Sequence, residues 1–218
     1  MHKKAFLFDL NGTMIDDMEY HVVAWSDILN NDLKAGLSYN EVKSQMYGKN
    51  DEVLARIFGE GYFPAQQVRE LSVEKERRYQ RAYLPQLRLI HGLHEFLAQA
   101  KELGIQLAIG SAAIPFNIDF VLDNLNIREY FGAIVSADDV DISKPHPETY
   151  LKCAAQLGVA PSECLVFEDA PKGVEAAMNA GMQAVVITTM HKAGEFAAYN
   201  NIQCFIENYA ALNPAQLL

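Results

Sequence analysis

Residues 5–13 read AFLFDLNGT, in which four consecutive apolar residues run into an aspartate and an Asn-Gly turn. A run that is apolar on both faces is typical of a buried strand in a parallel sheet. Similar short runs follow at 105–109, 133–135, 164–167 and 184–187, with helical patterns between them. This alternation predicts an α/β fold: a doubly wound, mostly parallel, Rossmann-like sheet with its site at the carboxyl ends of the strands.

The region 16–87 interrupts this alternation, because it shows helical periodicity and no strand pattern. Within it, Ser38 and Glu41 have the spacing of a capping box, in which each residue satisfies a backbone N–H of the other at a helix start. We therefore expect two domains. The α/β core comprises 1–15 and 88–218, and an all-helical cap is inserted at 16–87.

Composition limits the class of protein. The chain has 218 residues, half of them apolar, which is enough for a globular core, and its 18 basic and 28 acidic residues give a net charge of −10. Because such a surface repels a phosphate backbone, nucleic acid is excluded as a partner. The cysteines lack metal-site spacing and are typical of reduced thiols, and no apolar run suits a signal peptide or a membrane span. We expect a cytoplasmic monomer that does not bind membranes, with three free cysteines (Cys153, Cys164 and Cys204).

Carboxylates follow two of the predicted strands. Asp9 comes directly after the first, where it can act as a nucleophile or a metal ligand, and Gly12 lets the chain turn closely around an anion. Glu168 and Asp169 end the run at 164–167. Adjacent carboxylates need a compensating charge, most simply a hard cation such as Mg²⁺, which takes oxygen ligands.

A hydroxyl and an ammonium complete the set of chemical groups. The run at 105–109 leads into Gly110-Ser111-Ala112, which places a hydroxyl and free backbone N–H groups ahead of the next helix. Such an arrangement predicts a phosphate site. Lys144 is a lone cation just before another predicted helix start.

Four motifs occur in a fixed order along the chain: D-L-N-G-T at 9–13, G-S-A-A at 110–113, S-K-P at 143–145 and E-D-A-P-K-G-V at 168–174. With these motifs, the sequence resembles the haloacid dehalogenase superfamily over essentially its whole length. It looks most similar to the β-phosphoglucomutase-like group with a helical cap. The resemblance implies a Mg²⁺-dependent phosphatase or phosphomutase that acts on a small phosphorylated sugar.

By the same resemblance, Asp9 would attack phosphorus and form an aspartyl phosphate, while Ser111 and Lys144 hold the transferring group. Asp17, His21 and Trp25 look like the stretch that lies near the hinge and the sugar in β-phosphoglucomutases. A histidine that merely packs on a helix face is the alternative for His21. The substrate-binding positions that we assign are Gly12, Thr13, Asp17, His21, Trp25, Lys49, Ala112 and Asn117.

The resemblance also implies a Mg²⁺ site formed by Asp9, the main-chain carbonyl of Asn11 and Asp169, with Glu168 acting through water. Asn11 is where the chain departs from the group, which usually has an aspartate there as general acid and base. An amide cannot exchange a proton at neutral pH, and losing this help typically costs ~10² to 10⁴ in rate. We therefore expect an activity that Asn11 impairs or specialises.

Several explanations of Asn11 remain open. The position could be an engineered trap, a specialisation in which the substrate or His21 supplies the proton, or the mark of a non-catalytic protein that binds a phosphorylated metabolite. A phosphatase for substrates with good leaving groups would also tolerate the change. The cap departs as well, because Lys49 follows Gly48 where mutases have an arginine. That change weakens the mutase assignment more than the phosphatase assignment.

Overall fold

The computed structural model describes residues 3–218, and the chain divides into two compact units. The first, here called the α/β unit, comprises Met1–Asp16 and Arg88–Leu218, and the second, the helical unit, comprises Asp17–Leu87. The first boundary lies one residue later than the predicted one, and the second coincides with it.

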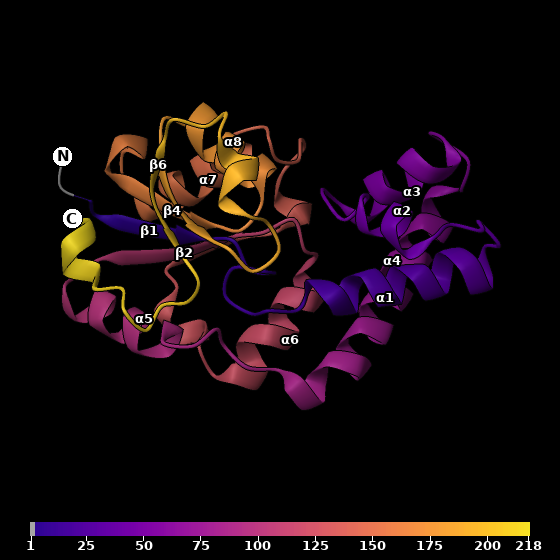
Figure 1. Ribbon diagram of the computed structural model, residues 1–218, viewed down its shortest axis with the longest axis horizontal. Coiled ribbons are helices and arrows are strands. Elements are labelled where there is room, and N and C mark those ends of the chain that lie inside the picture. Colours follow the sequence, from indigo (N-terminus) through magenta and orange to yellow (C-terminus); the bar gives the residue numbers. More distant parts are fainter. Residues whose placement is uncertain (1–2) are drawn as a thin grey trace. The chain divides into compact units, whose positions relative to one another are not determined.

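The α/β unit contains a six-stranded parallel sheet in the order β3-β2-β1-β4-β5-β6, and β1, β2 and β4 are seen in its middle in Figure 1. The predicted α/β fold is thereby confirmed. All five predicted runs lie in or overlap strands, and the sixth strand was not predicted. The strands are β1 (Ala5–Phe8), β2 (Gln106–Gly110), β3 (Ala133–Val135), β4 (Cys164–Glu168), β5 (Gln183–Ile187) and β6 (Ile202–Ile206).

Helices cover both faces of the sheet. In Figure 1, α7 and α8 lie on one face, and α5 and α6 lie on the other. These helices are α5 (Leu93–Glu102), α6 (Pro115–Leu125), α7 (Glu148–Leu157) and α8 (Pro171–Asn179). Short 3₁₀ turns complete the unit: Arg128–Tyr130, Ala137–Asp139, Pro161–Glu163, Ala193–Phe196 and Pro214–Leu217.

β1 shows why its sequence is apolar throughout. Successive side chains of a strand point to opposite faces, so a strand covered on both faces needs apolar residues at every position. Ala5 and Leu7 pack in the cluster that contains Tyr150 and Cys153 of α7, whereas Phe6 contacts Phe96 of α5, with ring centroids 5.7 Å apart. Every residue of β1 is fully buried.

The register of the strands brings the motifs to one edge of the sheet. Phe8 is paired with Ile109 of β2 and with Phe167 of β4. The residues that follow these positions, Asp9 and Glu168 among them, therefore emerge at the same carboxyl edge.

The helical unit is joined to the α/β unit through a paired stem. Ile15 forms an antiparallel bridge with Leu89, and the N–H of Ile90 donates to the carbonyl of Met14 at 2.9 Å. Both sides of this stem belong to the α/β unit.

The helical unit is built from four α-helices with short helical turns between and after them. They are α1 (Met18–Asp27), a π-helical turn (Ile28–Asp32), α2 (Tyr39–Lys43), α3 (Asn50–Phe58), α4 (Ala65–Tyr83) and a 3₁₀ turn (Leu84–Gln86). Its core gathers Trp25, Leu29, Val42 and Leu54. The predicted capping box between Ser38 and Glu41 is present at the start of α2. Among the described residues, no helix combines the length and apolar character that a membrane crossing requires.

Candidate active site

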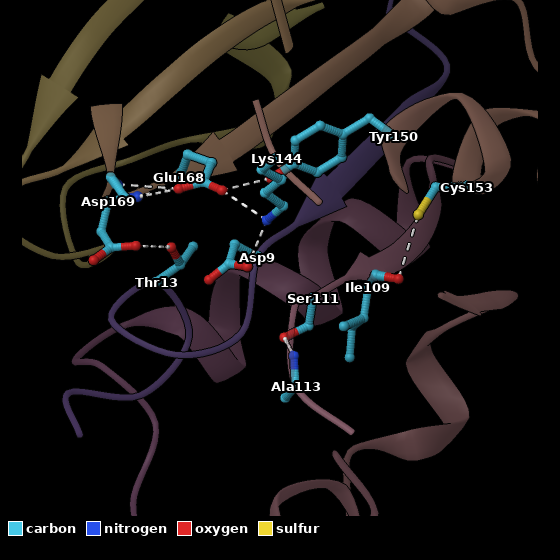
Figure 2. A network of polar contacts seen from close by, with 11 residues as sticks. Asp9, Thr13, Ile109, Ser111, Ala113, Lys144, Tyr150, Cys153, Glu168 and Asp169 are labelled. Carbon is cyan, nitrogen blue, oxygen red and sulfur yellow. Dashed lines mark hydrogen bonds and ion pairs between the residues drawn. The ribbon is translucent and has the colours of Figure 1, made fainter. Parts of the chain in front are cut away.

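An ammonium group links two carboxylates at the carboxyl edge of the sheet. Asp9 leaves β1 with its N–H bonded to the carbonyl of Phe167 at 2.9 Å. The Nζ of Lys144 lies 2.7 Å from Oδ1 of Asp9 and 2.8 Å from Oε1 of Glu168 (Figure 2). Burial alone would lower the pKa of Lys144, but the charges of Asp9 and Glu168 outweigh it and raise that pKa, so the group stays protonated.

Three carboxylates form a compact acidic cluster there. Asp9, Glu168 and Asp169 each offer an oxygen within 4.8 Å of the others, and Asp169 also accepts a hydrogen bond from Oγ1 of Thr13 at 3.2 Å. Burial, followed by the charges of Glu168 and Asp9, raises the pKa of Asp169 well above its usual range. With Lys144 as the ammonium beside them, the ionised cluster would carry two uncompensated negative charges. Such an oxygen-rich, negative set of donors suits a hard divalent cation.

Two glycines make room for these carboxylates. A Cβ on Gly12, whose φ is +79°, would lie 2.2 Å from Oδ2 of Asp169, and a Cβ on Gly173 would lie 1.7 Å from Oε1 of Glu168. At both positions a Cβ would overlap the carboxylate where it now lies. The two glycines therefore leave the space that the carboxylates of Glu168 and Asp169 occupy.

The Glu168 carboxylate is held through both of its oxygens. Oε2 accepts the backbone N–H groups of Asp169 and Ala170, each at 3.0 Å, just before α8 begins. Oε1 accepts from Lys144 and from the hydroxyl of Tyr150 at 2.7 Å. Burial, then the charge of Glu168, raises the pKa of Tyr150 well above its usual value, so its hydroxyl remains a donor.

The loop after β2 differs in one respect from the prediction of free backbone N–H groups. The N–H of Ser111 donates to the carbonyl of Val135 at 2.9 Å, and the N–H of Ala113 donates to Oγ of Ser111 at 3.1 Å. The N–H groups of Ser111 and Ala113, which we expected to bind an anion, therefore form hydrogen bonds within the protein. Ser111 is buried, Ala112 is half-buried, and Asn117 is buried in α6. The assignment of Ala112 and Asn117 to a substrate remains a prediction.

The predicted sugar-binding residues lie in the helical unit, where two of them belong to a buried polar network. Nε2 of His21 lies 3.1 Å from Oδ2 of Asp17, and Nδ1 of His21 lies 2.7 Å from Nζ of Lys75. The hydroxyl of Tyr79 donates to Asp17 at 2.6 Å, and Lys75 is paired with Glu76 at 2.9 Å. These contacts hold His21 on both ring nitrogens.

Within the helical unit, Trp25 packs in the core and Lys49 lies at the start of a helix. Trp25 is 1% exposed and packs in the core of that unit. Lys49 precedes α3, where its backbone N–H donates to Oε2 of Glu52 at 3.0 Å. Their assignment to a substrate remains a prediction.

Three residues that the sequence did not single out support the site. Tyr150 contacts Glu168, as described above. Thr189, just after β5, donates from Oγ1 to the carbonyl of Gly12 at 2.6 Å, and Tyr209 donates from its hydroxyl to the carbonyl of Thr13 at 3.0 Å. Neither Thr189 nor Tyr209 carries a local motif, and their partners are far away in the sequence. Only the folded chain shows their role in holding the loop after Asp9.

Comparison with known proteins identifies the family. The sequence model of the haloacid dehalogenase-like hydrolases matches residues 3–181. The chain belongs to this family. This hydrolase is 32% identical to the fructose-1-phosphate phosphatase YqaB of Escherichia coli (strain K12), over 83% of this chain and 94% of the relative. It is 34% identical to the β-phosphoglucomutase of Bacillus subtilis (strain 168), over 84% of this chain and 82% of the relative.

A solved structure extends the likeness across the whole hydrolase. A variant of CbbY from Rhodobacter sphaeroides, in complex with xylulose-(1,5)bisphosphate, superimposes with a TM-score of 0.83 at 25% identity and with 99% of each chain covered. The predicted resemblance to the haloacid dehalogenase superfamily and its β-phosphoglucomutase-like group is confirmed by these matches.

Proposed function

We propose that this protein is a Mg²⁺-dependent phosphotransferase, either a phosphatase or a phosphomutase, that acts on a small phosphorylated sugar. The observation that carries the proposal is the position of Asp9, which contacts the ammonium of Lys144 and lies beside Asp169 in a net negative cluster. Fructose 1-phosphate, which the name of the relative YqaB gives as its substrate, and the xylulose bisphosphate bound to the CbbY variant support a sugar phosphate.

In this proposal, a carboxylate oxygen of Asp9 forms a bond to phosphorus while the bond from phosphorus to the sugar oxygen breaks. The product is an aspartyl phosphate, and water or a second sugar hydroxyl then takes the phosphoryl group. Phosphoryl transfer depends mainly on positioning and on neutralising charge. Lys144 provides a fixed positive charge next to Asp9, and Ser111 would help to hold the transferring group.

Mg²⁺ would be held by Asp9, the main-chain carbonyl of Asn11 and Asp169, with Glu168 acting through water. When bound, it would supply the positive charge that the cluster lacks and polarise the phosphoryl oxygens. Gly12 and Gly173 fit this role, because they leave the space that the two neighbouring carboxylates occupy.

Asn11 should limit which phosphorylated compounds are turned over quickly. The sugar oxygen must gain a proton as it leaves, and the amide of Asn11 cannot donate one as an acid does. We therefore expect slow turnover of alkyl phosphates and faster turnover of acyl or aryl phosphates, whose leaving groups need no proton. Hydrolysis of the aspartyl phosphate should also be slow, because no base at position 11 activates the water.

The test is an assay of phosphorylated sugars, an aryl phosphate and an acyl phosphate, each with Mg²⁺ and with EDTA, using the parent and Asn11→Asp. We expect Mg²⁺-dependent turnover that Asn11→Asp raises by ~10² to 10⁴ for sugar phosphates and much less for the aryl phosphate. Release of inorganic phosphate identifies a phosphatase, and an isomerised sugar phosphate without such release identifies a phosphomutase.

A second candidate is a non-catalytic protein that binds a phosphorylated metabolite, and the observation that favours it is again Asn11. Binding without turnover in the parent and in Asn11→Asp, together with no phosphorylated Asp9 in the intact-mass spectrum, would establish this candidate. Turnover by the parent would exclude it, whereas turnover by Asn11→Asp alone would show that Asn11 is what blocks the reaction.

A further inference from the structure

Tyr150 contacts two charged residues of the candidate site, Glu168 and Lys144. It is in the first half of α7 and its side chain is fully buried. Its hydroxyl donates to Oε1 of Glu168 at 2.7 Å, and the Nζ of Lys144 lies 4.7 Å from the centre of its ring. Figure 2 shows the ring beside the Lys144 side chain, with Glu168 between Lys144 and Asp169.

Asp9 and Glu168 compete for the ammonium of Lys144. Its ammonium bonds to Asp9 and to Glu168 at nearly equal distances, 2.7 and 2.8 Å. Oε1 of Glu168 receives two donors, the ammonium and the Tyr150 hydroxyl. A second donor at the same oxygen spreads the negative charge and weakens the pull of Glu168 on the ammonium.

The ring of Tyr150 acts on the ammonium directly. A cation above an aromatic face is attracted by the ring, and this attraction is larger where water is excluded. The ring is also fixed in place: a Cβ on Gly110 would lie 3.2 Å from Cε1 of Tyr150, so the strand backbone passes close to its edge. The side chain can therefore define the position of a flexible lysine.

We propose that Tyr150 is a positioning residue for phosphoryl transfer, which holds Lys144 between Asp9 and Glu168 so that the ammonium stays against the nucleophile. This inference rests on the proposed function, because it assigns Tyr150 a part in the same reaction. Without the hydroxyl, the charge of Glu168 acts on Lys144 alone, and the ammonium shifts away from Asp9.

The first experiment compares the parent with Tyr150→Phe, which keeps the ring and removes only the hydroxyl. We expect kcat to fall about tenfold, as for one lost hydrogen bond near the reacting groups, with KM within about twofold. Cys153→Ala is the matched control, because Cys153 is buried in the same helix and its Sγ contacts the carbonyl of Ile109, away from Glu168. An equal loss of kcat in Cys153→Ala would show a packing role and overturn the proposal.

A double-mutant cycle makes the test sharper. In a Glu168→Gln background, the carboxylate charge that competes for Lys144 is absent, so adding Tyr150→Phe should change kcat by less than about twofold. If the two substitutions multiply as independent effects, Tyr150 does not act through Glu168 and the proposal fails.

Crystal structures of the parent and Tyr150→Phe provide a readout that needs no turnover. We expect the distance from Nζ of Lys144 to Oδ1 of Asp9 to lengthen in the variant while the contact with Glu168 remains. Unchanged contacts to both carboxylates would overturn the proposal. If the parent turns over no phosphate ester, the proposed function fails, whereas this comparison of structures still decides how Tyr150 positions Lys144.

Discussion

Each unit of the protein buries a cluster of ionisable side chains, and the two clusters differ in the balance between negative and positive groups. In the helical unit, Asp17 accepts from Tyr79 and contacts His21, while Glu76 is paired with Lys75 and accepts from the Asn50 amide at 3.0 Å. Both donors to Glu76 reach its Oε1, and its Oε2 is buried without a hydrogen-bond partner among the described residues. In the α/β unit, three carboxylates lie together with one ammonium beside them.

The difference distinguishes a cluster that stabilises a fold from one that is suited to a ligand. A buried charge is tolerated when it is paired and hydrogen-bonded, and an excess of one sign must be relieved by a proton or by a bound ion. Burial first, and then the negative charges of Glu168 and Asp9, raise the pKa of Asp169. Substitutions at equivalent places in the two clusters should therefore have different consequences.

The largest contrast is expected between Asp9→Asn and Asp17→Asn. Removing the proposed nucleophile should lower turnover by roughly 10⁴-fold or more, while the thermal midpoint of the metal-free protein should not fall, because one of three like charges is gone. Asp17→Asn weakens bonds to buried donors and should lower the free energy of unfolding by about 1–3 kcal/mol. Steady-state assays and thermal scans in EDTA measure both. Persisting Mg²⁺-dependent turnover in Asp9→Asn would rule out Asp9 as the nucleophile.

A second contrast compares the two buried lysines. Lys75→Met removes the ammonium that is paired with Glu76, and should cost about 3–5 kcal/mol of stability with or without Mg²⁺. Lys144→Met leaves an acidic cluster that binds Mg²⁺ more tightly, so added Mg²⁺ should recover much of its lost stability. Urea unfolding with and without Mg²⁺ measures this difference. An equal response of the two variants to Mg²⁺ would contradict it.

The smallest contrast is the response to acid. Burial favours the neutral form of Glu76, but the charge of Lys75 and the bond from Asn50 prevail, and its pKa lies below the ordinary 4.5. The unfolded chain then binds this proton first, so the contribution of Glu76 is present above that value and is lost as the pH falls through its lowered pKa. The pKa of Asp169 is raised instead, so its folded form keeps a proton that the unfolded chain releases. Metal-free stability due to Asp169 therefore falls as the pH rises towards its raised pKa.

Two charge-neutral variants separate these opposite slopes. Glu76→Gln should flatten the loss of stability on the acidic side, and Asp169→Asn should flatten the loss as the pH rises. Urea unfolding without metal across the pH range from about 2 to 7 gives both slopes. If Glu76 and Asp169 made stability change with pH in the same direction, the two clusters would not differ in their charge balance.

Much of the α/β unit could be predicted, because its central strands are continuous apolar runs. The predicted bounds of β1 and β3 coincide with the structure, and those of β2, β4 and β5 differ by one residue at an end or at both ends. β6 was missed because it is an edge strand that alternates half-buried and exposed residues, with Gln203 and Phe205 exposed. Such a segment lacks the apolar run that marks a central strand.

Local motifs placed Asp9, Lys144 and Glu168 at strand and loop ends, and the structure brings them together. Tyr150 could not be found in this way, because a tyrosine inside a helix is usually a packing residue and only the fold shows its hydroxyl on Glu168. The network of His21 with Lys75 joins residues 54 positions apart in the sequence. No local pattern reports a pairing over that distance.

The bridge between Ile15 and Leu89 closes the α/β unit at the point where the helical segment is inserted. Since the two ends of the helical segment leave from a stem that is already paired within the α/β unit, a short turn can close that stem when Asp17–Leu87 is removed. We therefore expect that a whole helical segment can be exchanged at this stem without any cut through the sheet. Chimaeras made at this stem would test whether the helical unit determines which substrate the α/β unit acts on.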